Sequence, residues 1–350
     1  MISLEWVKDY IDISDQDLEE LAVKITQSGI NVEKVITNHI NNLVIGEVLE
    51  CVAHPDSDHL HVCKVNVGNI TEQIVCGAPN VREGLKVIVA LPGAVLPGDF
   101  EIKKSKIRGV ESNGMLCALY ELGLEEKNDE TYAKGIEELG ADAPVGEDPL
   151  KYLGLDDTLY ELDIHKHRNN DCYYHIGFAY EIGAILNRPV TLPDLSFKED
   201  QNNVENYFTL DVETEKCPFY LAKMVKNAKI GESPEFIKKR LLAAGMRPIN
   251  NVVDISNYVM LEFGQPLHFF DKNRLGNHIL VRDAKDKEEV ITLDGKRRIL
   301  SSNDIVITDG NRPVCIAGVM GGENTEVEQD TTDILIEAAI FDPVSIRYTA

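Results

Sequence analysis

The sequence predicts a multidomain α+β protein. A helical N-terminal domain is interrupted by a small antiparallel β-barrel and followed by a mixed α/β domain. Three observations support this prediction. The 350 residues are enough for two or three domains of ordinary size. The hydrophobic period changes from 3.6 to 2 near residue 43 and returns to a helical period near residue 171. Beyond residue 208, another helix is followed by a series of strand-like segments.

The composition is that of a folded chain with a strongly acidic balance. Hydrophobic residues make up 43% and charged residues 27%, and no run approaches eighteen apolar residues. We therefore expect no membrane span, and the first residues do not resemble a secretion signal. With 35 Lys and Arg against 59 Asp and Glu, the net charge is −24. General binding to DNA or other polyanions is disfavoured, so any RNA contact needs a local basic patch or a partner subunit.

The cysteines and histidines do not predict a metal site. Seven cysteines are scattered, odd in number and never spaced as C-x-x-C, which indicates reduced thiols in a cytoplasmic protein. The loop His54–His61 is rich in His and Asp, but its spacing is too loose for a zinc site. We expect no bound metal.

Helices open and close the predicted N-terminal domain, which comprises residues 1–41 and 151–195. Leu4, Val7 and Ile11 would lie on one helical face, and Ser14 can cap a second helix. Asp171 can cap a further helix that continues to Leu186. We expect this helix to pack against the first two.

Residues 42–150 form the predicted barrel domain. Strand-like segments run over residues 43–49, 61–67, 74–76 and 87–90, with Gly68-Asn69 as a turn. Short strands at this spacing are typical of a small antiparallel barrel.

A linker over residues 190–206 precedes the third predicted domain, residues 205–350. Ser233-Pro234-Glu235 predicts a helix start and Gly245 its end. Strands are expected at 279–281, 290–293 and 304–307, with a tight turn at Asp294-Gly295.

The barrel sequence resembles the tRNA-binding OB-fold module of synthetase-associated proteins. The resemblance rests on three stretches, His54-Pro55-Asp56-Ser57-Asp58-His59-Leu60, Ile74–Asn80 and Ile102–Cys117. It implies that a cationic cluster contacts RNA phosphates, namely Lys103, Lys104, Lys106 and Arg108. Residues 43–124 nevertheless hold seven Lys and Arg against ten Asp and Glu, so a purely structural packing role stays open.

The third domain resembles the editing domain of the β subunit of bacterial phenylalanyl-tRNA synthetases. The stretch Leu241–Asp271 carries this resemblance, and Ala317–Glu323 and Ile336–Ala339 fit it. The helix–barrel–helix order also matches the start of that subunit. His165–Asp171 departs from the family pattern, because it lacks a proline and is one residue longer.

The resemblance implies hydrolytic editing of mischarged Tyr-tRNA(Phe). Glu337 would accept a hydrogen bond from the substrate's phenolic hydroxyl, and His268 would lie near the ester. Even without the resemblance, Glu337 is unusual, because it stands in an apolar strand-like segment. The six residues that the resemblance assigns to the site are His268, Glu337, Gly318, Gly321, Asn250 and Asn251.

The resemblance also implies partners and cofactors for a complete enzyme. These are tRNA(Phe), an α subunit in an (αβ)₂ assembly, and ATP with Mg²⁺ for aminoacylation, whereas this chain itself needs no cofactor. Since the family continues past Ala350 with a threonine-containing segment, we expect an editing domain truncated at its C-terminus and an incomplete site. Two alternatives remain open: a non-catalytic tRNA-binding or assembly module, and a divergent stand-alone paralogue.

Overall fold

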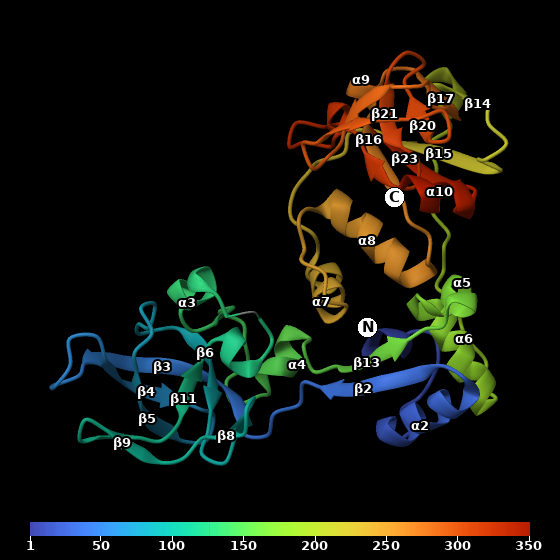
Figure 1. Ribbon diagram of the computed structural model, residues 1–350. Helices are drawn as coiled ribbons and strands as arrows, with labels where there is room; N and C mark the ends of the chain where they lie inside the picture. Colours follow the sequence, from blue (N-terminus) through green and yellow to red (C-terminus); the bar gives the residue numbers. More distant parts are fainter. Residues whose placement is uncertain (126) are drawn as a thin grey trace. The chain divides into compact units, whose positions relative to one another are not determined.

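The structure is a computed structural model that describes residues 1–125 and 127–350. The described chain divides into two compact units (Figure 1). The larger unit consists of Met1–Val35 and Leu159–Ala350, and the smaller unit consists of Ile36–Thr158. The smaller unit is thus inserted into the sequence of the larger one. A mixed α and β architecture in several parts agrees with the predicted α+β class.

A small sheet and several helices form the N-terminal part of the larger unit. The sheet has the strand order β1-β13-β2, with β1 antiparallel to β13. The elements are β1 (Ile2–Ser3), α1 (Leu4–Val7), α2 (Leu18–Ser28), β2 (Asn31–Thr37), β13 (Thr158–Asp163), η2 (Lys166–Arg168), α5 (Asn169–Cys172) and α6 (His175–Leu186).

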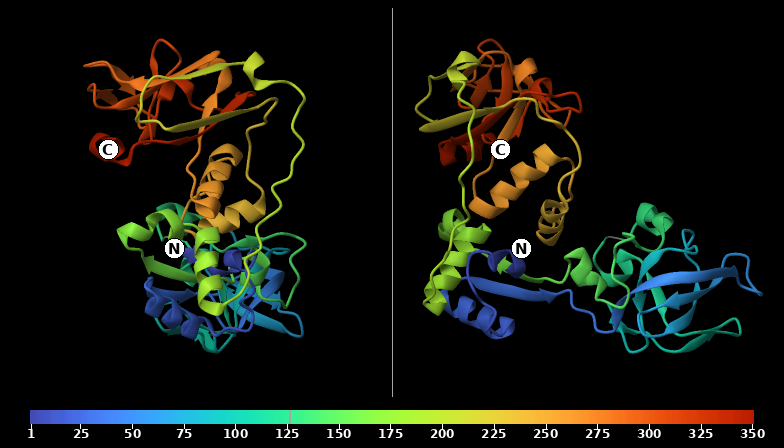
Figure 2. Two further views of the ribbon diagram at one scale, coloured as in Figure 1. Left: turned by 90° about the vertical axis from the view of Figure 1, so that its right-hand side faces the viewer. Right: turned by 180° about the vertical axis from the view of Figure 1, so that it is seen from behind.

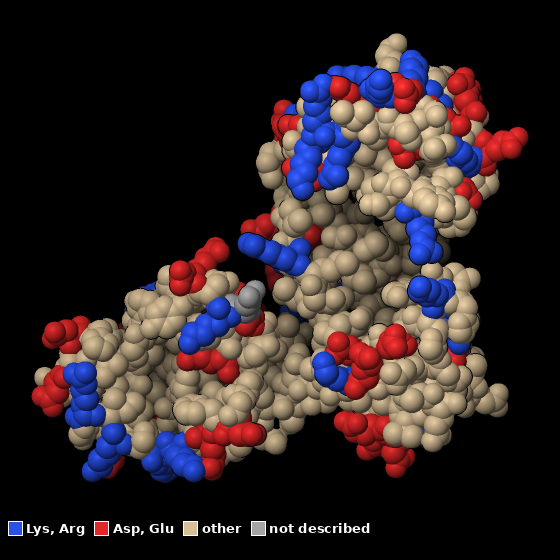
Figure 3. All heavy atoms as spheres, in the orientation of Figure 1, with Lys and Arg blue, Asp and Glu red and all other residues tan. Residues whose placement is uncertain are grey.

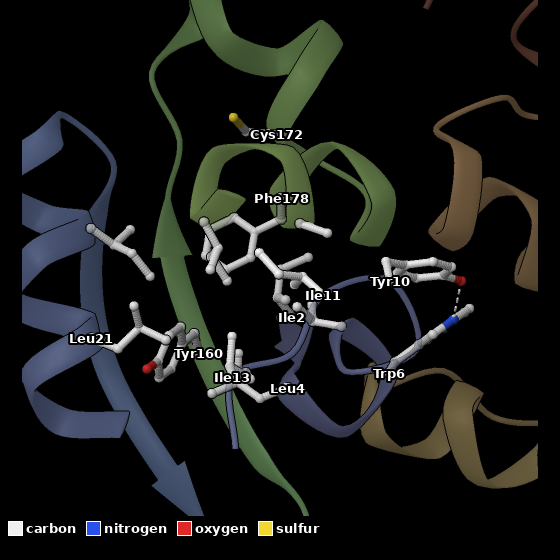
Figure 4. Packing of buried hydrophobic residues seen from close by; sticks show 14 of the residues in the cluster. Ile2, Leu4, Trp6, Tyr10, Ile11, Ile13, Leu21, Tyr160, Cys172 and Phe178 are labelled. Atoms are coloured by element: carbon white, nitrogen blue, oxygen red, sulfur yellow. Dashed lines mark hydrogen bonds between the residues drawn. The ribbon is translucent and has the colours of Figure 1, made fainter. Parts of the chain in front are cut away.

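Aromatic side chains organise the core of this part (Figure 4). Trp6, Tyr160 and Phe178 are almost fully buried among leucines and isoleucines from α1, α2 and α6. The indole N–H of Trp6 donates to the Tyr10 hydroxyl at 2.9 Å, which Figure 4 shows as a dashed line. The rings of Tyr160 and Phe178 meet edge to face, with centroids 6.4 Å apart. The helix after the barrel therefore shares one core with the two opening helices.

The second helix begins later than the sequence analysis predicted. Asp17, and not Ser14, caps α2: its carboxylate accepts from the backbone N–H groups of Glu19 and Glu20, both at 3.0 Å. The Ser14 hydroxyl instead donates to Asp12 at 2.7 Å. Both residue types are good caps and both precede the apolar stripe, so propensity could not decide between them.

The other two helices of this part also differ from the prediction. α1 has only four residues, so Ile11 is buried outside a helix. α6 begins at His175, and Asp171 does not cap it. The Asp171 carboxylate instead accepts from the guanidinium of Arg168 at 2.8 Å, because an ion-pair partner lies three residues before it.

The smaller unit is built on one antiparallel sheet with the strand order β11-β6-β3-β4-β5, and β12 also pairs with β6. Two short hairpins, β7·β8 and β9·β10, extend from it. The elements are β3 (Leu43–Ala53), β4 (His61–Asn66), β5 (Thr71–Cys76), β6 (Lys86–Ala90), β7 (Val95–Leu96), β8 (Phe100–Glu101), β9 (Ser105–Ile107), β10 (Val110–Ser112), β11 (Met115–Cys117), η1 (Leu119–Leu122), α3 (Asp129–Lys134), β12 (Glu138–Leu139) and α4 (Pro149–Leu153).

Hydrogen bonds join β5, at one edge of this sheet, to β10 and to Asn113, which precedes the other edge strand β11. The backbone N–H of Asn113 donates to the carbonyl oxygen of Gln73 at 2.8 Å, and the Gln73 side chain donates to the carbonyl oxygen of Glu111 at 2.8 Å. The sheet therefore curves around a core into a half-closed barrel. The inward side chains include Val48, Val65, Ile74, Val87 and Val89.

The segment after α6 leads into the C-terminal part of the larger unit (Figure 2). Residues 190–203 form neither helix nor strand, in keeping with the predicted linker. The elements that follow are η3 (Val204–Asn206), β14 (Thr209–Val212), β15 (Phe219–Val225), α7 (Glu235–Ala243), α8 (Asn251–Phe263), β16 (His268–Asp271), α9 (Lys272–Leu275), β17 (His278–Asp283), β18 (Glu289–Ile291), β19 (Arg297–Ile299), β20 (Ile305–Thr308), β21 (Pro313–Ile316), β22 (Met320–Gly321), η4 (Glu323–Thr325), β23 (Ile334–Ile340) and α10 (Pro343–Thr349).

Two sheets pack on each other in this C-terminal part. One has five strands in the order β14-β17-β20-β21-β22, and the other has three in the order β15-β23-β16. Phe270 and Leu335 of the three-stranded sheet share a core with Ile279 and Ile307 of the five-stranded sheet. Val252 of α8 packs on the opposite face of the three-stranded sheet. That sheet is therefore covered on both faces.

Helices α7 and α8 contact the N-terminal core of the same unit. The guanidinium of Arg240 lies 5.0 Å from the centre of the Trp6 ring and donates to the Tyr258 hydroxyl at 2.6 Å. Burial lowers the pKa of His175 to about 4, so its ring is neutral. This ring stacks on Trp6 at 4.0 Å and donates through Nδ1–H to the carbonyl oxygen of Leu261 at 2.8 Å.

The turn residues of this part largely follow the prediction. Gly245 follows α7 with a φ of +81°, and Gly295 has a φ of +71° in the turn between β18 and β19. Ser233 differs, because its hydroxyl donates to the Asp254 carboxylate of α8 and does not cap α7. Within the described residues, no helix combines the length and the apolar character needed to cross a bilayer.

Replacing Asp17 with alanine is expected to lower the free energy of unfolding of the larger unit by about 1 kcal/mol, because two N–H groups of α2 lose their acceptor. Urea denaturation followed by fluorescence measures this, since Trp6 is the only tryptophan and lies in the same core. Ser14→Ala is the matched control, with an expected change within about 0.5 kcal/mol. A loss in Ser14→Ala as large as that in Asp17→Ala would contradict the assigned cap.

Candidate functional site

The three-stranded sheet places two of the predicted site residues opposite each other. β16 and β23 are antiparallel, and their register pairs His268 with Glu337. Directly opposite residues point to the same face of a sheet, with Cβ atoms about 4.5–5.5 Å apart. Phe270 and Leu335 occupy this face next to them and belong to the buried core. The imidazole and the carboxylate therefore lie together at the border of that core.

Glu337 is buried without a cationic partner. The residue is only 5% exposed, and it forms no ion pair with any other described residue. Its Oε2 accepts a hydrogen bond from the Tyr220 hydroxyl at 3.0 Å, whereas Oε1 has no hydrogen-bond partner among the residues that the structure describes. Burial raises the pKa of Glu337 to about 7, and the Tyr220 hydrogen bond acts in the opposite direction. The carboxylate can accept a further hydrogen bond.

His268 is a neutral imidazole beside this carboxylate. Burial lowers its pKa to about 4, so the ring carries no charge near neutral pH. Its edge packs on Phe270 with ring centroids 4.4 Å apart. Among the described residues, none forms a hydrogen bond with either ring nitrogen. The ring can therefore donate one hydrogen bond and accept another from a ligand or a water molecule.

Gly321 lies directly against the His268 ring. A Cβ atom built on Gly321 would overlap the imidazole and would also lie 3.0 Å from Leu293 Cδ1. Gly321 comes from β22, in the five-stranded sheet, so the two sheets meet at this point. The imidazole of His268 fits at this position because Gly321 has no side chain.

Gly318 lies in different surroundings from these three residues. Its φ of +66° is in the left-handed region that favours glycine. A Cβ atom there would lie 2.9 Å from Ile346 Cδ1 and 3.2 Å from Phe341 Cδ2. The nearest neighbours of a side chain at Gly318 would thus be α10 and the segment before it, and Glu337 is not among them.

Asn250 and Asn251 also have contacts of their own. The Asn250 side chain caps α8 by accepting from two backbone N–H groups of its first turn, at 3.1 and 3.0 Å. The Asn251 amide accepts from the backbone N–H of Gly231 at 3.2 Å and donates to the carbonyl oxygen of Lys229 at 2.9 Å. Because α8 packs on the opposite face of the three-stranded sheet, these amides do not join Glu337 and His268.

The predicted basic cluster of the smaller unit is partly neutralised. Lys103 and Lys106 form ion pairs with acidic neighbours, at N–O distances of 2.8 and 3.7 Å. Arg108 donates to a backbone carbonyl oxygen at 2.8 Å, and Lys104 forms no ion pair with another described residue. On the face that Figure 3 shows, Lys and Arg side chains lie among Asp and Glu side chains. The cluster is therefore a weaker cationic surface than its sequence indicated.

The His-rich loop has structural contacts. The backbone N–H of Asp56 donates to His54 Nδ1 at 3.0 Å, so the other ring nitrogen donates to the carbonyl oxygen of Ile107 at 3.1 Å. Both ring nitrogens of His54 are occupied. In residues 1–125 and 127–350, no group of three or more His, Cys, Asp or Glu residues is arranged to hold a metal ion.

The sequence analysis missed Tyr220. Alternation in β15 could indicate that Tyr220, Ala222 and Met224 share a face, but not which strand they meet. Nor does the sequence indicate that Cys217 and Cys315 lie near Glu337, where burial and this carboxylate raise the pKa of both thiols. These contacts depend on the pairing of strands that are far apart in the sequence.

Two family models match separate parts of the chain. A family model described as "B3/4 domain" matches residues 216–350, which include Glu337 and His268. A second, described as "Putative tRNA binding domain", matches residues 43–148. The phenylalanine–tRNA ligase β subunit of Geobacillus kaustophilus is 50% identical and covers 99% of this chain. The chain belongs to the phenylalanine–tRNA ligase β-subunit family. It matches the N-terminal part of those subunits, and the predicted family is thus confirmed.

Other curated relatives of this chain are also phenylalanine–tRNA ligase β subunits. The β subunit of Bacillus cereus is 47% identical over 100% of this chain, and that of Desulfotalea psychrophila is 48% identical over 99%. The chain spans only 44% of the length of the first two curated relatives and 42% of the third. A solved N-terminal fragment of the phenylalanyl-tRNA synthetase β subunit from Pyrococcus horikoshii aligns with a TM-score of 0.31 and 14% identity, covering 55% of this chain and 58% of that one.

Replacing Gly321 with alanine is expected to displace the His268 ring, because the added methyl group would overlap it. The free energy of unfolding is expected to fall by about 1–3 kcal/mol, the usual cost of overpacking. The His268 ring signals are also expected to shift in NMR spectra. Gly231→Ala is the matched control, since a Cβ atom there meets nothing within 4 Å. Unchanged His268 signals in Gly321→Ala would show that the two residues are not in contact.

The titration of Glu337 predicts a specific pH dependence of stability. Its pKa is about 7 in the folded chain against an ordinary 4.5, so between these values the folded state binds more protons than the unfolded state. The stability contribution is therefore full below pH 4.5 and is lost as the pH rises to about 7. Glu337→Gln removes this titration, so its stability relative to the unchanged protein should rise by up to about 3 kcal/mol across this range. The titration of His268 is present in both proteins and cancels. Urea denaturation from pH 4.5 to 8 measures the difference, and a pH-independent difference would contradict it.

Proposed function

We propose that this chain carries the editing site of a phenylalanine–tRNA ligase β subunit, which hydrolyses Tyr-tRNA(Phe) and spares Phe-tRNA(Phe). One observation carries the proposal. Glu337 is a buried carboxylate that has no cationic partner among the described residues, and it lies opposite the neutral His268. None of those residues donates to its Oε1, which can accept a further hydrogen bond. The membership of the chain in this β-subunit family supports it.

The carboxylate supplies the discrimination between tyrosine and phenylalanine. A tyrosyl group would donate its phenolic hydroxyl to the free oxygen of Glu337, whereas a phenylalanyl group would cover that oxygen and leave it without a donor. A buried charged acceptor without a partner is costly, so the phenylalanyl group is disfavoured. Sites built to hydrogen-bond a substrate hydroxyl reject the analogue that lacks it far better than an apolar pocket rejects an added hydroxyl.

Hydrolysis of the ester requires little more than positioning. A water molecule attacks the carbonyl carbon, the bond to the ribose oxygen breaks, and that oxygen takes up a proton, so the products are free tyrosine and tRNA. An aminoacyl ester is already activated, and orientation alone supplies a large part of the acceleration. The neutral imidazole of His268 would orient the water or the terminal ribose through its unbonded nitrogens.

The remaining predicted residues have supporting roles in this proposal. Gly318 would shape the turn before β22, and Asn250 and Asn251 would hold α8 beneath the sheet that carries the site. These positions would act on the substrate only through the elements that they support.

The domain layout in this proposal follows the sequence analysis. Residues 1–41 with 151–195 would form the N-terminal domain, 42–150 an OB-fold tRNA-binding domain and 205–350 the editing domain. Lys104 and Arg108 would be the main phosphate contacts of the basic cluster, because Lys103 and Lys106 are already paired with acids. Contact of the OB-fold domain with tRNA would be auxiliary.

Aminoacylation belongs to the complete enzyme in this proposal. The β subunit would assemble with an α subunit as (αβ)₂ in the cytoplasm, and ATP and Mg²⁺ would serve the synthetic reaction there. Editing at Glu337 and His268 would need neither.

Deacylation of purified Tyr-tRNA(Phe) and Phe-tRNA(Phe) tests the proposal. We expect this chain, or a version lengthened by about fifty downstream residues, to release tyrosine faster than phenylalanine. Glu337→Ala should remove this preference by slowing tyrosine release about tenfold or more, the effect of a lost hydrogen bond to a charged group. His268→Ala should slow release and keep the preference.

Gly231→Ala serves as the control variant, because the residue lies outside the site and tolerates a methyl group. Equal release of the two amino acids by this chain and by its lengthened version, both without substitutions, would reject the editing proposal. If both versions bind tRNA but release neither amino acid, the result favours the non-catalytic binding module.

A further inference from the structure

A tyrosine of the chain itself already donates to the proposed specificity carboxylate. Tyr220 stands on β15 and Glu337 on β23, and their antiparallel register pairs Tyr220 with Ala339 and Ala222 with Glu337. Tyr220 and Glu337 are thus diagonal neighbours on one face, a separation that an aromatic side chain spans. The hydroxyl donates to Glu337 Oε2 at 3.0 Å.

Two alanines favour this diagonal contact. Between β15 and β23, Ala222 is opposite Glu337 and Ala339 is opposite Tyr220, so on this side neither larger side chain meets a bulky residue directly across. The Tyr220 ring packs against the core between the two sheets, which restricts its position. The hydroxyl is therefore held beside the carboxylate by packing on the ring as well as by the hydrogen bond.

We propose that Tyr220 is a positioning residue for specificity: its hydroxyl occupies Oε2 of Glu337, so that Oε1 alone is presented to the para position of the substrate ring. This inference rests on the proposed editing function. An ionised carboxylate has room for several donors, so two phenolic hydroxyls can share it, one from the protein and one from the substrate. With a phenylalanyl group only the internal donor remains, and Oε1 is covered without a partner.

Among the described residues around Glu337, Tyr220 is the one that donates a hydrogen bond to it. The titratable residues that face it are Tyr220 on β15, the neutral His268 on β16, and the thiols of Cys217 and Cys315. Burial raises the pKa of the Tyr220 phenol well above its usual range, so Tyr220 keeps its proton and remains a donor. Burial also raises the pKa of Glu337, and the Tyr220 hydrogen bond is the opposing influence. Without this donor, Glu337 would be protonated at a higher pH.

Tyr220→Phe tests the proposal, since it removes one oxygen atom and keeps the ring. The carboxyl carbon of Glu337, labelled with ¹³C and assigned with Glu337→Gln, is titrated by NMR in the whole chain. We expect the midpoint to rise by about one pH unit or more in Tyr220→Phe, as for loss of a hydrogen bond to a charged group. The preference for tyrosine over phenylalanine in deacylation should fall about fivefold at pH 7, because the ionised fraction of Glu337 drops from about one half to about one tenth, and it should recover near pH 8.5, where Glu337 is mostly ionised again.

Tyr348→Phe is the matched control, because it removes a phenolic hydroxyl from an 87% exposed side chain of the same unit. An unchanged midpoint in Tyr220→Phe would overturn the proposal. A raised midpoint with an unchanged preference for tyrosine would also overturn it, because the contact would then have no role in specificity. If the unchanged protein shows no preference at all, the editing function itself is rejected and the specificity role fails with it. The midpoint still reports separately on whether Tyr220 donates to Glu337.

Discussion

A carboxylate that is buried without a cation is the constraint on which the candidate site depends. Burying a charge is costly unless hydrogen bonds compensate for the lost water. At Glu337 one such bond comes from Tyr220, and no other residue in the described part of the chain donates to the second oxygen. Among the described residues, one oxygen of this carboxylate therefore stays open to a further donor. A ligand hydroxyl that reaches the second oxygen completes its hydrogen bonding, which is the physical basis of a preference for a phenol.

The pairing of three strands gives this carboxylate its chemical neighbours. β23 is the central strand, so Glu337 meets β15 on one side and β16 on the other. The first contributes a proton donor that keeps its proton, and the second contributes the neutral His268. The second sheet contributes Gly321, whose missing side chain leaves room for the imidazole. Glu337, His268 and the backbone at Gly321 therefore come from strands of two packed sheets, and none of them lies on a loop.

Local signals in the sequence predicted helices, strands and turns better than they predicted contacts between distant side chains. Apolar alternation and turn residues located the four strands β3 to β6 of the smaller unit and the hairpin at Gly295, because these depend on near neighbours. A lone carboxylate in an apolar strand marked Glu337 for the same reason. Apolar alternation and turn residues did not locate the shorter strands β7 to β12. Local signals failed where two answers were equally good, as for Ser14 and Asp17 as caps. They could not find Tyr220 beside Glu337, because register between distant strands is set by packing of the whole unit.

The most direct test of this account is the affinity of the chain for two stable analogues of the charged tRNA end. These are adenosines that carry tyrosine or phenylalanine through a 3′-amide in place of the ester, and calorimetry at pH 8 measures their binding with Glu337 ionised. The account predicts that the tyrosyl compound binds about tenfold more tightly or better, because it alone donates to the free oxygen of Glu337. Equal affinities for the two compounds would contradict the claim that this buried carboxylate recognises a phenol.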